Sequence, residues 1–442
     1  MLHLLTLAKT ILEHKANTKL SRKQLQAKQI KKFRKLVAFA YQHSPFYARI
    51  IQEQKIDIKH CTPLDFPEIT KTDVNNHFDE IITNPDITKE QIAKFLANST
   101  NPNELFKNRY YVITTSGTSG NIGYFIYSRR EWLKGLAHSL KFHSIGLRKK
   151  IAFVAATTGH FAGISMASSS QHFASKVLFQ LQCFEINDSF EDIANQLNKF
   201  QPDILVSYAG ILRLLAEKQQ KGELKIQPEV IESSGEVLLK QDKTFIQNNF
   251  NSSIINCYAC SEHLLLGMSN IHSDCLSLFE DDLIFEFHSD HLCVTNLYNY
   301  TMPLIRYKMN DVLIPKKILD SQSPFIEIEK FCGRNDNMPI FKNVDGKTDF
   351  FSYFMLDDLF IEIENFDKFQ IKVVNSEKFI FNFIAKPCTA EDKKLKIKKD
   401  IQEKLEQILA QKKMHNVKFE IKEVESLNVD ARTGKFNLIV FE

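Results

Sequence analysis

The stretch Tyr110-Tyr111-Val112-Ile113-Thr114-Thr115-Ser116-Gly117-Thr118-Ser119-Gly120 decides how the rest of the chain is read. Its first half has the aromatic and β-branched residues typical of a strand, and glycines and hydroxyl residues follow at once. Tyr124-Phe125-Ile126-Tyr127 then returns to a strand pattern. Because glycine lacks the Cβ that would keep a phosphate away, such a loop can bring backbone N–H groups close to an anion. A plain hairpin turn rich in Ser and Thr is the alternative.

This loop differs from the P-loop of nucleotide hydrolases. That motif places Gly-Lys-Ser/Thr at the start of a helix. Here Asn121-Ile122-Gly123 carries no lysine and leads into an extended segment. The loop by itself therefore leaves phosphate binding open.

Size and composition indicate a packed globular protein. The chain has 442 residues, of which 43% are hydrophobic and 25% charged, with 36 phenylalanines and 14 glycines. This length is enough for two or three domains. The formal net charge is +4, from 57 basic and 53 acidic residues. Since no basic stripe is interleaved with aromatic residues, we expect no nucleic-acid partner.

The compartment is predicted from the cysteines and the N-terminus. Eight scattered cysteines favour reduced thiols in a cytoplasmic protein. The first apolar segment is interrupted by Lys9 and has no small-residue cleavage site, so we expect no signal peptide. No apolar run is long enough for a transmembrane segment.

Strands alternate with helices between residues 151 and 258, after two largely helical regions over 1–50 and 74–97, the second interrupted at Pro85. This alternation predicts βαβ units and a largely parallel sheet. Ligands of such sheets bind beyond the carboxyl ends of the strands. Those ends carry Thr157–His160, Ser207–Gly210, Ser233–Glu236 and Tyr258–Glu262.

The pattern changes from residue 283, where a hairpin is expected over 283–297. Beyond Gly333 the chain reads as a small α+β unit, with a helix over 391–412 and a last hairpin cut by Thr433-Gly434-Lys435. We therefore expect an α/β protein with two domains. The large domain covers 1–332, with mixed sheets and helices, and the small α+β domain covers 333–442.

Further short segments stand in the order and spacing of a known family. They are His43-Ser44-Pro45-Phe46-Tyr47, Pro67-Glu68-Ile69-Thr70-Lys71, Ser234-Gly235-Glu236, Tyr258-Ala259-Cys260-Ser261-Glu262, Arg306-Tyr307-Lys308-Met309-Asn310-Asp311, Gly333-Arg334-Asn335-Asp336 and Gly434-Lys435. With the opening loop, they resemble the adenylate-forming superfamily of acyl-CoA synthetases over nearly the whole chain. Within it, the chain looks most like the branch of phenylacetate–CoA ligase and capsule-biosynthesis adenylating enzymes. It departs from the family pattern at Ser119, which replaces a threonine, and at Asn310, which replaces a glycine.

The resemblance implies binding of ATP and Mg²⁺, and a mobile C-terminal domain. Thr115, Ser116, Gly117, Thr118, Ser119 and Gly120 would hold the β- and γ-phosphates. Ser234, Gly235, Glu236 and Tyr258 would frame the adenine, and Asp311 would accept the ribose hydroxyls. The resemblance makes Lys435, Glu262 and Arg334 catalytic: Lys435 would act between the carboxylate and the α-phosphate, Glu262 would hold Mg²⁺, and Arg334 would reach the nucleotide. Asp336 would be the hinge, and His160, Phe161, Ala209, Gly210 and Cys260 would line the acyl pocket.

Each role has a plainer structural alternative. Glu262 could start a surface helix, Asp311 could be a turn residue, and Tyr258 could pack in the core. Residues 234–236 could form a plain turn. Arg334 and Asp336 could form surface ion pairs, and Lys435 could be a solvated turn lysine.

Two other motifs point to different chemistry. Cys257, Cys260 and His263, with Cys275 beyond them, have metal-ligand spacing but lack the second pair of a structural zinc site. Ser165 and Ser168-Ser169-Ser170 with His160 or His172 suggest a serine hydrolase, but no Gly-x-Ser-x-Gly elbow is present. We favour the adenylating interpretation over both.

The predicted function is ATP-dependent activation of a small carboxylic acid to an acyl-adenylate, followed by transfer to CoA as a thioester. An aromatic or other small organic acid is the first candidate substrate. One alternative keeps the first step and passes the acyl group to an amine, a sugar or a carrier-protein thiol. Another is a nucleotide-binding homologue without catalysis, suggested by the altered loop and Asn310. The sequence leaves the oligomeric state open, a homodimer included.

Overall fold

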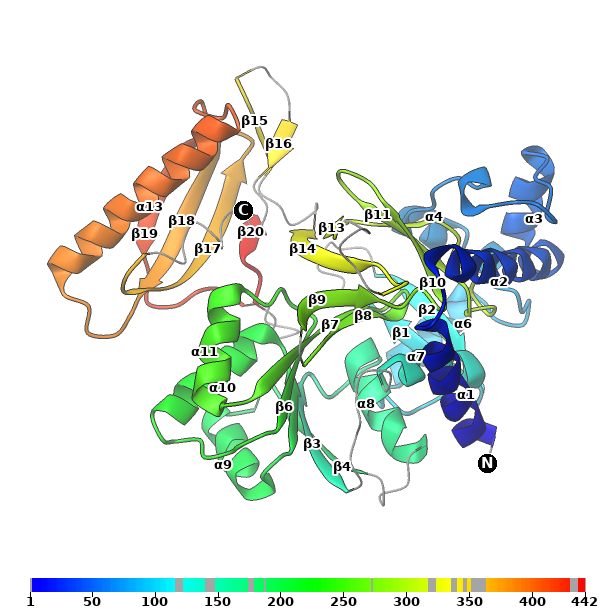
Figure 1. Cartoon of the computed structure of the whole chain (residues 1–442), viewed down its shortest axis with the longest axis horizontal. Helices are drawn as coiled ribbons and strands as arrows, with labels where there is room; N and C mark the ends of the chain where they lie inside the picture. Colours follow the sequence, from blue (N-terminus) through cyan, green and yellow to red (C-terminus); the bar gives the residue numbers. More distant parts are fainter. Residues whose placement is uncertain are drawn as a thin grey trace.

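The computed structural model describes residues 2–115, 122–139, 148–173, 179–186, 188–271, 273–316, 323–334, 340–344, 348–350, 363–429 and 436–441. Figure 1 shows a large body that contains the N-terminal helices and a nine-stranded sheet, and a smaller unit beside it that ends the chain. The predicted α/β fold class is confirmed.

Three helices open the chain: α1 (Leu2–Asn17), α2 (Arg22–His43) and α3 (Pro45–Glu53). Ser21 begins α2 through a capping box with Gln24. Ser44 ends α2 and caps α3, where Pro45 occupies the first helical position that proline favours. A short 3-10 turn (Pro63–Asp65) follows, and the helical region predicted over 74–97 is divided into α4 (Lys71–Asn76), α5 (Phe78–Ile81) and α6 (Lys89–Asn98).

A buried acidic turn fastens these helices to the body. Asp281 lies 2.6 Å from Nδ1 of His14 in α1, and Glu280 accepts two hydrogen bonds from Arg22 at the start of α2. Both acidic residues are almost fully buried. Buried charges need partners of this kind, so the pairing fixes where the helices attach.

The nine-stranded sheet has the order β13-β14-β9-β8-β7-β6-β5-β3-β4. From β4 to β7 neighbouring strands are parallel, and from β7 to β13 they are antiparallel, so the prediction of a largely parallel sheet holds for one half. The strands are β3 (Lys149–Ala155), β4 (Phe179–Glu185), β5 (Ile204–Ser207), β6 (Val230–Ser234), β7 (Ser253–Cys260), β8 (Leu264–Asn270), β9 (Ser273–Leu278), β13 (Asp311–Pro315) and β14 (Glu327–Arg334).

Helices connect the parallel strands, as the alternating pattern predicts. They are α8 (Ala162–Phe173), α9 (Phe190–Phe200), α10 (Ala209–Gln220) and α11 (Lys240–Phe250). The apolar faces of α9, α10 and α11 form one buried cluster with β3, β5 and β6, which includes Leu205, Leu212 and Ile231. This packing holds the strand ends rigidly in place.

Two smaller sheets complete the large body. The opening loop joins β1 (Tyr110–Thr114) to β2 (Tyr124–Ser128), which pair antiparallel and lead into α7 (Arg129–Ser139). The predicted hairpin over 283–297 is confirmed as β10 (Leu283–Phe287) and β11 (Leu292–Asn296), with β12 (Tyr307–Met309) added to it.

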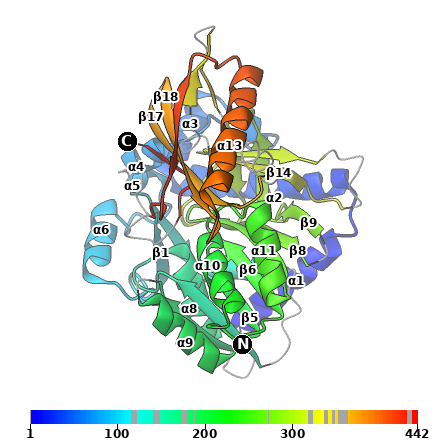
Figure 2. The same ribbon diagram turned by 90° about the vertical axis from the view of Figure 1, so that its left-hand side faces the viewer.

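The C-terminal unit is a four-stranded sheet covered by one long helix, α13 (Glu391–Gln411). Its strands are β17 (Phe366–Asn375), β18 (Lys378–Ala385), β19 (Lys418–Glu423) and β20 (Ile439–Phe441), and a separate two-stranded sheet is formed by β15 (Ile340–Lys342) and β16 (Thr348–Phe350). Figure 2 shows α13 and the strands of this unit as a layer of their own above α10 and α11. Because β14 extends to Arg334, residues 333 and 334 belong to the nine-stranded sheet, and the division at 332/333 stays a prediction.

Side-chain contacts join the C-terminal unit to α10. Arg213 forms ion pairs with Asp242 at 3.1 Å and with Asp367 at the start of β17. Nearby, Lys368 Nζ lies 2.9 Å from Glu217 Oε1. No helix in the described part of the chain is long and apolar enough to cross a membrane.

Candidate active site

The predicted binding edge of the sheet is formed by neighbouring strands. Segments 157–160, 207–210, 233–236 and 258–262 lie at or beyond the carboxyl ends of β3, β5, β6 and β7, which are adjacent in the order β7-β6-β5-β3. The parallel register, with Val154 opposite Ser207 and Ser207 opposite Ser233, aligns the first three of these ends. The polar residues that follow the strands therefore meet at one edge.

Lys71 supplies a positive charge at the root of the opening loop. Its Nζ donates to Oγ1 of Thr115 at 3.0 Å. The same oxygen accepts the backbone N–H of Gly123 at 3.0 Å, while the N–H of Thr115 donates to the Gly123 carbonyl. The two residues that flank the predicted phosphate loop, Thr115 and Gly123, therefore both lie beside the ammonium group of Lys71.

Local sequence explains how Lys71 reaches this position. Thr70 and Asp73 form a capping box that begins α4 at Lys71. A Cβ on Gly123 would lie 3.1 Å from Cε of Lys71 and 2.9 Å from the Phe125 ring. Glycine at 123 is therefore what allows the lysine to approach so closely.

Lys71 ends one of the segments that carry the family resemblance, Pro67–Lys71, but the sequence alone gives it no role at the phosphate loop. The missing lysine in the loop was the available signal, since it required a cation from another segment. The nearest candidate in the described structure lies 44 residues before Thr115.

Glu262 lies beside this loop. Ser261 Oγ donates to the carbonyl of Thr114 at 3.1 Å, and the Tyr127 hydroxyl donates to the carbonyl of Ser261 at 2.9 Å. These bonds fasten the turn after β7 to the β1–β2 hairpin. The Glu262 carboxylate is half-buried and lies 3.4 Å from the Tyr307 hydroxyl. It is part of a turn rather than of a surface helix.

Tyr258, Asp311 and Arg334 come together from three strands. The Tyr258 hydroxyl donates to Oδ2 of Asp311 at 2.7 Å, and both side chains are more than nine-tenths buried. Asp311 stands directly opposite Arg334 in the pairing of β13 with β14. The Tyr258 ring also packs edge-on against Phe331, with ring centroids 5.3 Å apart.

Glu236 connects the sheet edge to the end of the chain. Its Oε2 accepts the N–H of Gly210 at 2.8 Å, and its Oε1 accepts the N–H of Phe436 at 2.7 Å. Gly235 before it has a φ of +78°, a conformation that favours glycine and turns the chain after β6. Ser234 ends β6 and is half-buried. Glu236 therefore holds backbone groups from two segments, rather than presenting a free carboxylate at the predicted adenine position.

The predicted acyl-pocket residues divide into two groups. The His160 ring is buried against Phe95 and lies 3.1 Å from the Ser99 hydroxyl, and its carbonyl accepts the N–H of Thr114. Burial lowers the pKa of His160, so its ring stays neutral near neutral pH. The Phe161 side chain is half-buried beside it.

The second group lies on β7 and α10. Cys260 is half-buried at the end of β7, and burial raises its pKa well above the ordinary thiol value. Ala209 is buried at the start of α10, and a Cβ on Gly210 would lie 3.3 Å from Oε2 of Glu236 and 3.4 Å from Cβ of Phe436. These contacts place Gly210 beside the C-terminal segment.

Several predicted site residues lie outside the described residues. They are Ser116, Gly117, Thr118, Ser119 and Gly120 of the loop, the hinge residue Asp336, and Lys435. Arg334 is described only through its backbone. Phe436, which follows Lys435, is the part of that segment hydrogen bonded to Glu236.

The two alternative motifs do not assemble in the described part of the chain. Cys257, Cys260 and His263 are not among the side chains there that converge closely enough to hold a metal ion. Ser165 is fully buried, and the ring of His160 pairs with Ser99 instead of with a catalytic serine. These observations disfavour both a zinc site at residues 257–263 and a hydrolase based on Ser165.

Comparisons with known proteins agree with the observed fold. No family model matches the chain. The chain is 27% identical over 325 residues to Protein CapK of Staphylococcus aureus, covering 70% of this chain and 68% of that protein. It is 23% identical over 356 residues to phenylacetate-coenzyme A ligase of Thermus thermophilus, covering 74% of each.

Among solved structures, the chain is similar to 2-hydroxyisobutyryl-CoA ligase. The TM-score is 0.76 for the postadenylation state in complex with an acyl-AMP, at 13% identity, with 96% of this chain and 91% of that chain covered. For the thioesterification state with CoA, the TM-score is 0.58 at 15% identity and the same coverage.

Proposed function

We propose that this chain, which belongs to the adenylate-forming superfamily on the branch of CapK and phenylacetate–CoA ligase, is an ATP-dependent ligase that activates a small carboxylic acid as its acyl-adenylate and then transfers the acyl group to the thiol of CoA. An aromatic acid is the first candidate substrate. The proposal joins the large and small units of the chain into one site, with residues 1–332 binding ATP and the acid, and residues 333–442 supplying Lys435.

The observation that carries the proposal is the buried hydrogen bond between Tyr258 and Asp311. It brings together two of the motifs on which the family resemblance rests, 53 residues apart in the chain. Asp311 also pairs in register with Arg334, which belongs to a third motif. A chance set of short matches would have no reason to converge at one place.

The chemistry requires positive charge around a crowded triphosphate. In the first step a carboxylate oxygen forms a bond to the α-phosphorus of ATP, the bond from that phosphorus to the bridging oxygen breaks, and pyrophosphate leaves. In the second step a thiolate attacks the acyl carbon and AMP leaves. The protein aligns these groups and stabilises the charge that develops in the transition state.

Residues of this chain can supply most of that environment. The loop from Thr115 to Gly120 would grip the pyrophosphate side, and Lys71 at its root would neutralise part of the charge. Lys435 would act between the carboxylate and the α-phosphate. Asp311 would hold the ribose, with its position set by Tyr258. Residues 234–236 and Tyr258 would border the adenine.

Glu262 fits the requirements of a Mg²⁺ ligand. Its carboxylate is half-buried and, among the described residues, its hydrogen-bond partner is the Tyr307 hydroxyl. The preceding residue, Ser261, is bonded to Thr114, next to the start of the predicted phosphate loop. Mg²⁺ is commonly held by one or two carboxylates together with phosphate oxygens. When bound, the ion would neutralise phosphate charge.

The position of the C-terminal unit supports the proposal that this conformation carries out the first step, adenylation. Phe436, next to Lys435, is hydrogen bonded to Glu236 at the sheet edge. The higher TM-score with the postadenylation structure than with the thioesterification structure agrees with this arrangement. A rotation about Asp336 would then expose the other face for the thiol.

Isotope exchange between ATP and pyrophosphate, measured with a panel of small acids, tests the proposal. Acid-dependent exchange is expected, with the substrate giving the fastest rate. ATP binding without exchange for any acid would contradict the ligase function and favour a homologue without catalysis. CoA-dependent release of AMP then separates thioester formation from transfer to an amine, a sugar or a carrier-protein thiol.

A further inference from the structure

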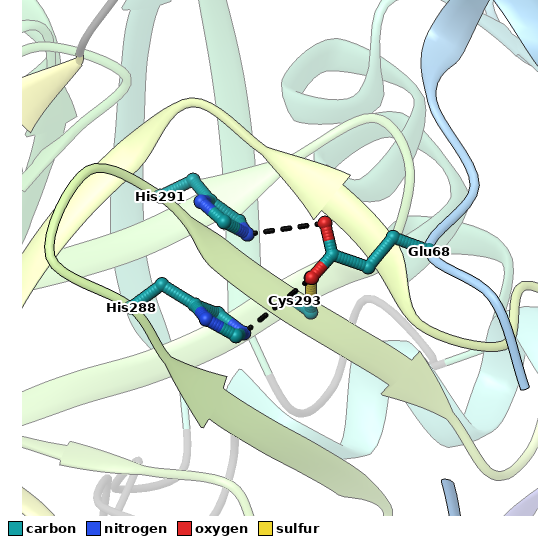
Figure 3. A group of neighbouring side chains, drawn as sticks. All are labelled: Glu68, His288, His291 and Cys293. Carbon is teal, nitrogen blue, oxygen red and sulfur yellow. Dashed lines mark ion pairs between the residues drawn. The ribbon is translucent and has the colours of Figure 1, made fainter. Parts of the chain in front are cut away.

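Four potential metal ligands converge away from the predicted nucleotide residues. They are Glu68, His288, His291 and Cys293, each with one ligand atom within 4.8 Å of the others. Figure 3 shows both imidazole rings and the Cys293 sulfur turned toward the carboxylate of Glu68. Three of the four follow a short pattern in the sequence, His-x-x-His-x-Cys, which lies in the turn between β10 and β11 and at the start of β11.

Backbone hydrogen bonds hold the four residues in place before any ligand is considered. The N–H of His288 donates to the carbonyl of His291 at 3.0 Å and closes the turn. On the other side, Ile69 donates to the carbonyl of Arg306 at 3.1 Å and accepts from the N–H of Lys308 at 2.8 Å. Glu68 is thus fixed against β12, the strand that pairs with β11.

His291 provides the observation that points to a ligand. Its Nδ1 lies 2.7 Å from Oδ1 of Asp290, so in the neutral ring Nδ1 carries the proton and Nε2 has a lone pair. Nε2 is buried, has no hydrogen-bond partner among the described residues, and faces Oε2 of Glu68 at 3.2 Å. Two acceptors this close need a cation or a proton between them. His291 is only 8% exposed.

His288 also turns its Nε2 atom toward the Glu68 carboxylate, as His291 does. Its ring stacks on that of His291, with centroids 4.2 Å apart and an interplanar angle of 4°. Its Nε2 is also buried, has no hydrogen-bond partner in the described part of the chain, and lies 3.7 Å from Oε1 of Glu68. Cys293 adds a fully buried sulfur.

The distances suit a tetrahedral ion. Zinc bonds of about 2.0–2.3 Å separate neighbouring tetrahedral ligands by roughly 3.3–3.8 Å. The two measured nitrogen–oxygen distances, 3.2 and 3.7 Å, are close to this range. Asp290 also orients the His291 ring, as carboxylates commonly orient zinc-bound histidines.

The surrounding charges are compatible with a dication. The Arg306 guanidinium lies 3.6 Å from Oε1 of Glu68, but it is paired with Glu286 at 2.8 Å and donates to the Phe66 carbonyl at 2.7 Å. A thiolate from Cys293 and the Glu68 carboxylate would balance a doubly charged ion. Imidazole, thiolate and carboxylate together form a donor set that zinc accepts.

We propose that Glu68, His288, His291 and Cys293 bind one Zn²⁺ ion in a closed, structural site. The ion joins the segment before α4 to the β10–β11 hairpin. Glu68 is three residues before Lys71, so the site also fixes the base from which Lys71 reaches Thr115. The proposal concerns metal binding and does not depend on the ligase function.

Metal analysis of the full chain, purified without a metal-affinity tag from zinc-supplemented medium, tests the site. We expect about one zinc per chain in the wild type and less than about a tenth in Cys293→Ala. Reconstitution of the metal-free chain with Co²⁺ should give a tetrahedral d–d spectrum and a thiolate-to-cobalt charge-transfer band. Cys293→Ala should lack that band, whereas the exposed-cysteine control Cys388→Ala should keep it.

A second variant keeps the test valid if Cys293→Ala does not fold. Asp290→Asn leaves all four ligands in place and removes only the carboxylate that orients His291. Its zinc dissociation constant should rise by about 10–100-fold. Absence of zinc together with absence of a cobalt band in the wild type would overturn the proposal, and the four residues would then form an ion-pair network. Zinc retained fully by both Cys293→Ala and Asp290→Asn would also overturn it, because the metal would bind elsewhere.

Discussion

The Nζ atom of Lys71 lies 3.0 Å from Oγ1 of Thr115, the first residue of a predicted phosphate loop that contains no lysine of its own. The contact joins the beginning of α4 to the end of β1. Because Thr115 also accepts the N–H of Gly123, both ends of the loop meet at this ammonium group. A cation delivered from another segment can neutralise phosphate charge as well as one within the loop.

Replacement of Lys71 by alanine should therefore slow adenylation. Loss of one preorganised positive group at a developing charge costs about 10²–10³-fold in rate, so ATP–pyrophosphate exchange should fall by that amount. The exposed lysine variant Lys59→Ala serves as the control and should exchange at the wild-type rate. Equal exchange rates for Lys71→Ala and wild type would show that Lys71 only braces the loop.

Lys435→Ala should separate the two half-reactions. Adenylation should decrease by orders of magnitude, because the positive charge between carboxylate and α-phosphate is lost. Thioester formation from a supplied acyl-adenylate should continue near the wild-type rate, with Lys418→Ala, an exposed lysine of the same unit, as the comparison. If both half-reactions decline equally, the assignment of Lys435 to one face of a rotating domain is wrong.

The sequence predicts the parts of the site that follow from local patterns. Tyr258 and Ser207 stand at or near the ends of strands whose alternation with helices predicts βαβ units. The structure confirms those strands, β7 and β5, in one parallel run on either side of β6. The contact between Lys71 and Thr115 depends on how two distant segments pack against each other. The hydrophobic periodicity of the sequence does not predict such packing. The same holds for Glu236, whose bond to Phe436 spans 200 residues.

The region expected to be mostly helical over 74–97, with an interruption at Pro85, is interrupted there between α5 and α6, and a further break at His77 separates α4 from α5. The prediction of a largely parallel sheet failed for half of the strand pairs. The sheet is parallel only up to β7, because Leu264 begins a strand that returns beside β7 without an intervening helix. A pattern of short apolar runs does not show whether the next strand will pair parallel or antiparallel.

Tyr258→Phe should weaken both the fold and nucleotide binding. The change removes a buried hydrogen bond to the Asp311 carboxylate, and a hydrogen bond to a charged group contributes about 1.5–3 kcal/mol. Urea denaturation should show this loss in the free energy of unfolding, and the KM for ATP should increase. Tyr41→Phe, which alters a partly exposed tyrosine, should change neither quantity. Unaltered unfolding and an unaltered KM in Tyr258→Phe would contradict the role given to this pair.

Asp367→Asn tests the contact between α10 and the C-terminal unit. Asp367 pairs with Arg213, and the pair is mostly buried, so its loss should favour release of the unit from α10. We expect ATP–pyrophosphate exchange to fall by about 5–30-fold, equivalent to roughly 1–2 kcal/mol, with thioester formation from the adenylate unchanged or faster. Glu377→Gln, at an exposed position between β17 and β18, is the matched control. A decrease confined to thioester formation would reverse the assignment of the described conformer.

His263 should make the fold sensitive to acid. Its ring is fully buried, neither nitrogen has a hydrogen-bond partner among the residues that the structure describes, and burial lowers its pKa to about 3. In the unfolded chain the pKa returns to about 6.5, so the unfolded state binds more protons below that pH and stability falls as the pH falls toward about 3. Between about pH 7 and about pH 5 this group should remove about 2 kcal/mol from the free energy of unfolding. His263→Leu, measured by urea denaturation at each pH, should lack that part of the slope, whereas the exposed-histidine variant His60→Gln should retain it. Parallel slopes for His263→Leu and wild type would mean that other groups carry the acid sensitivity.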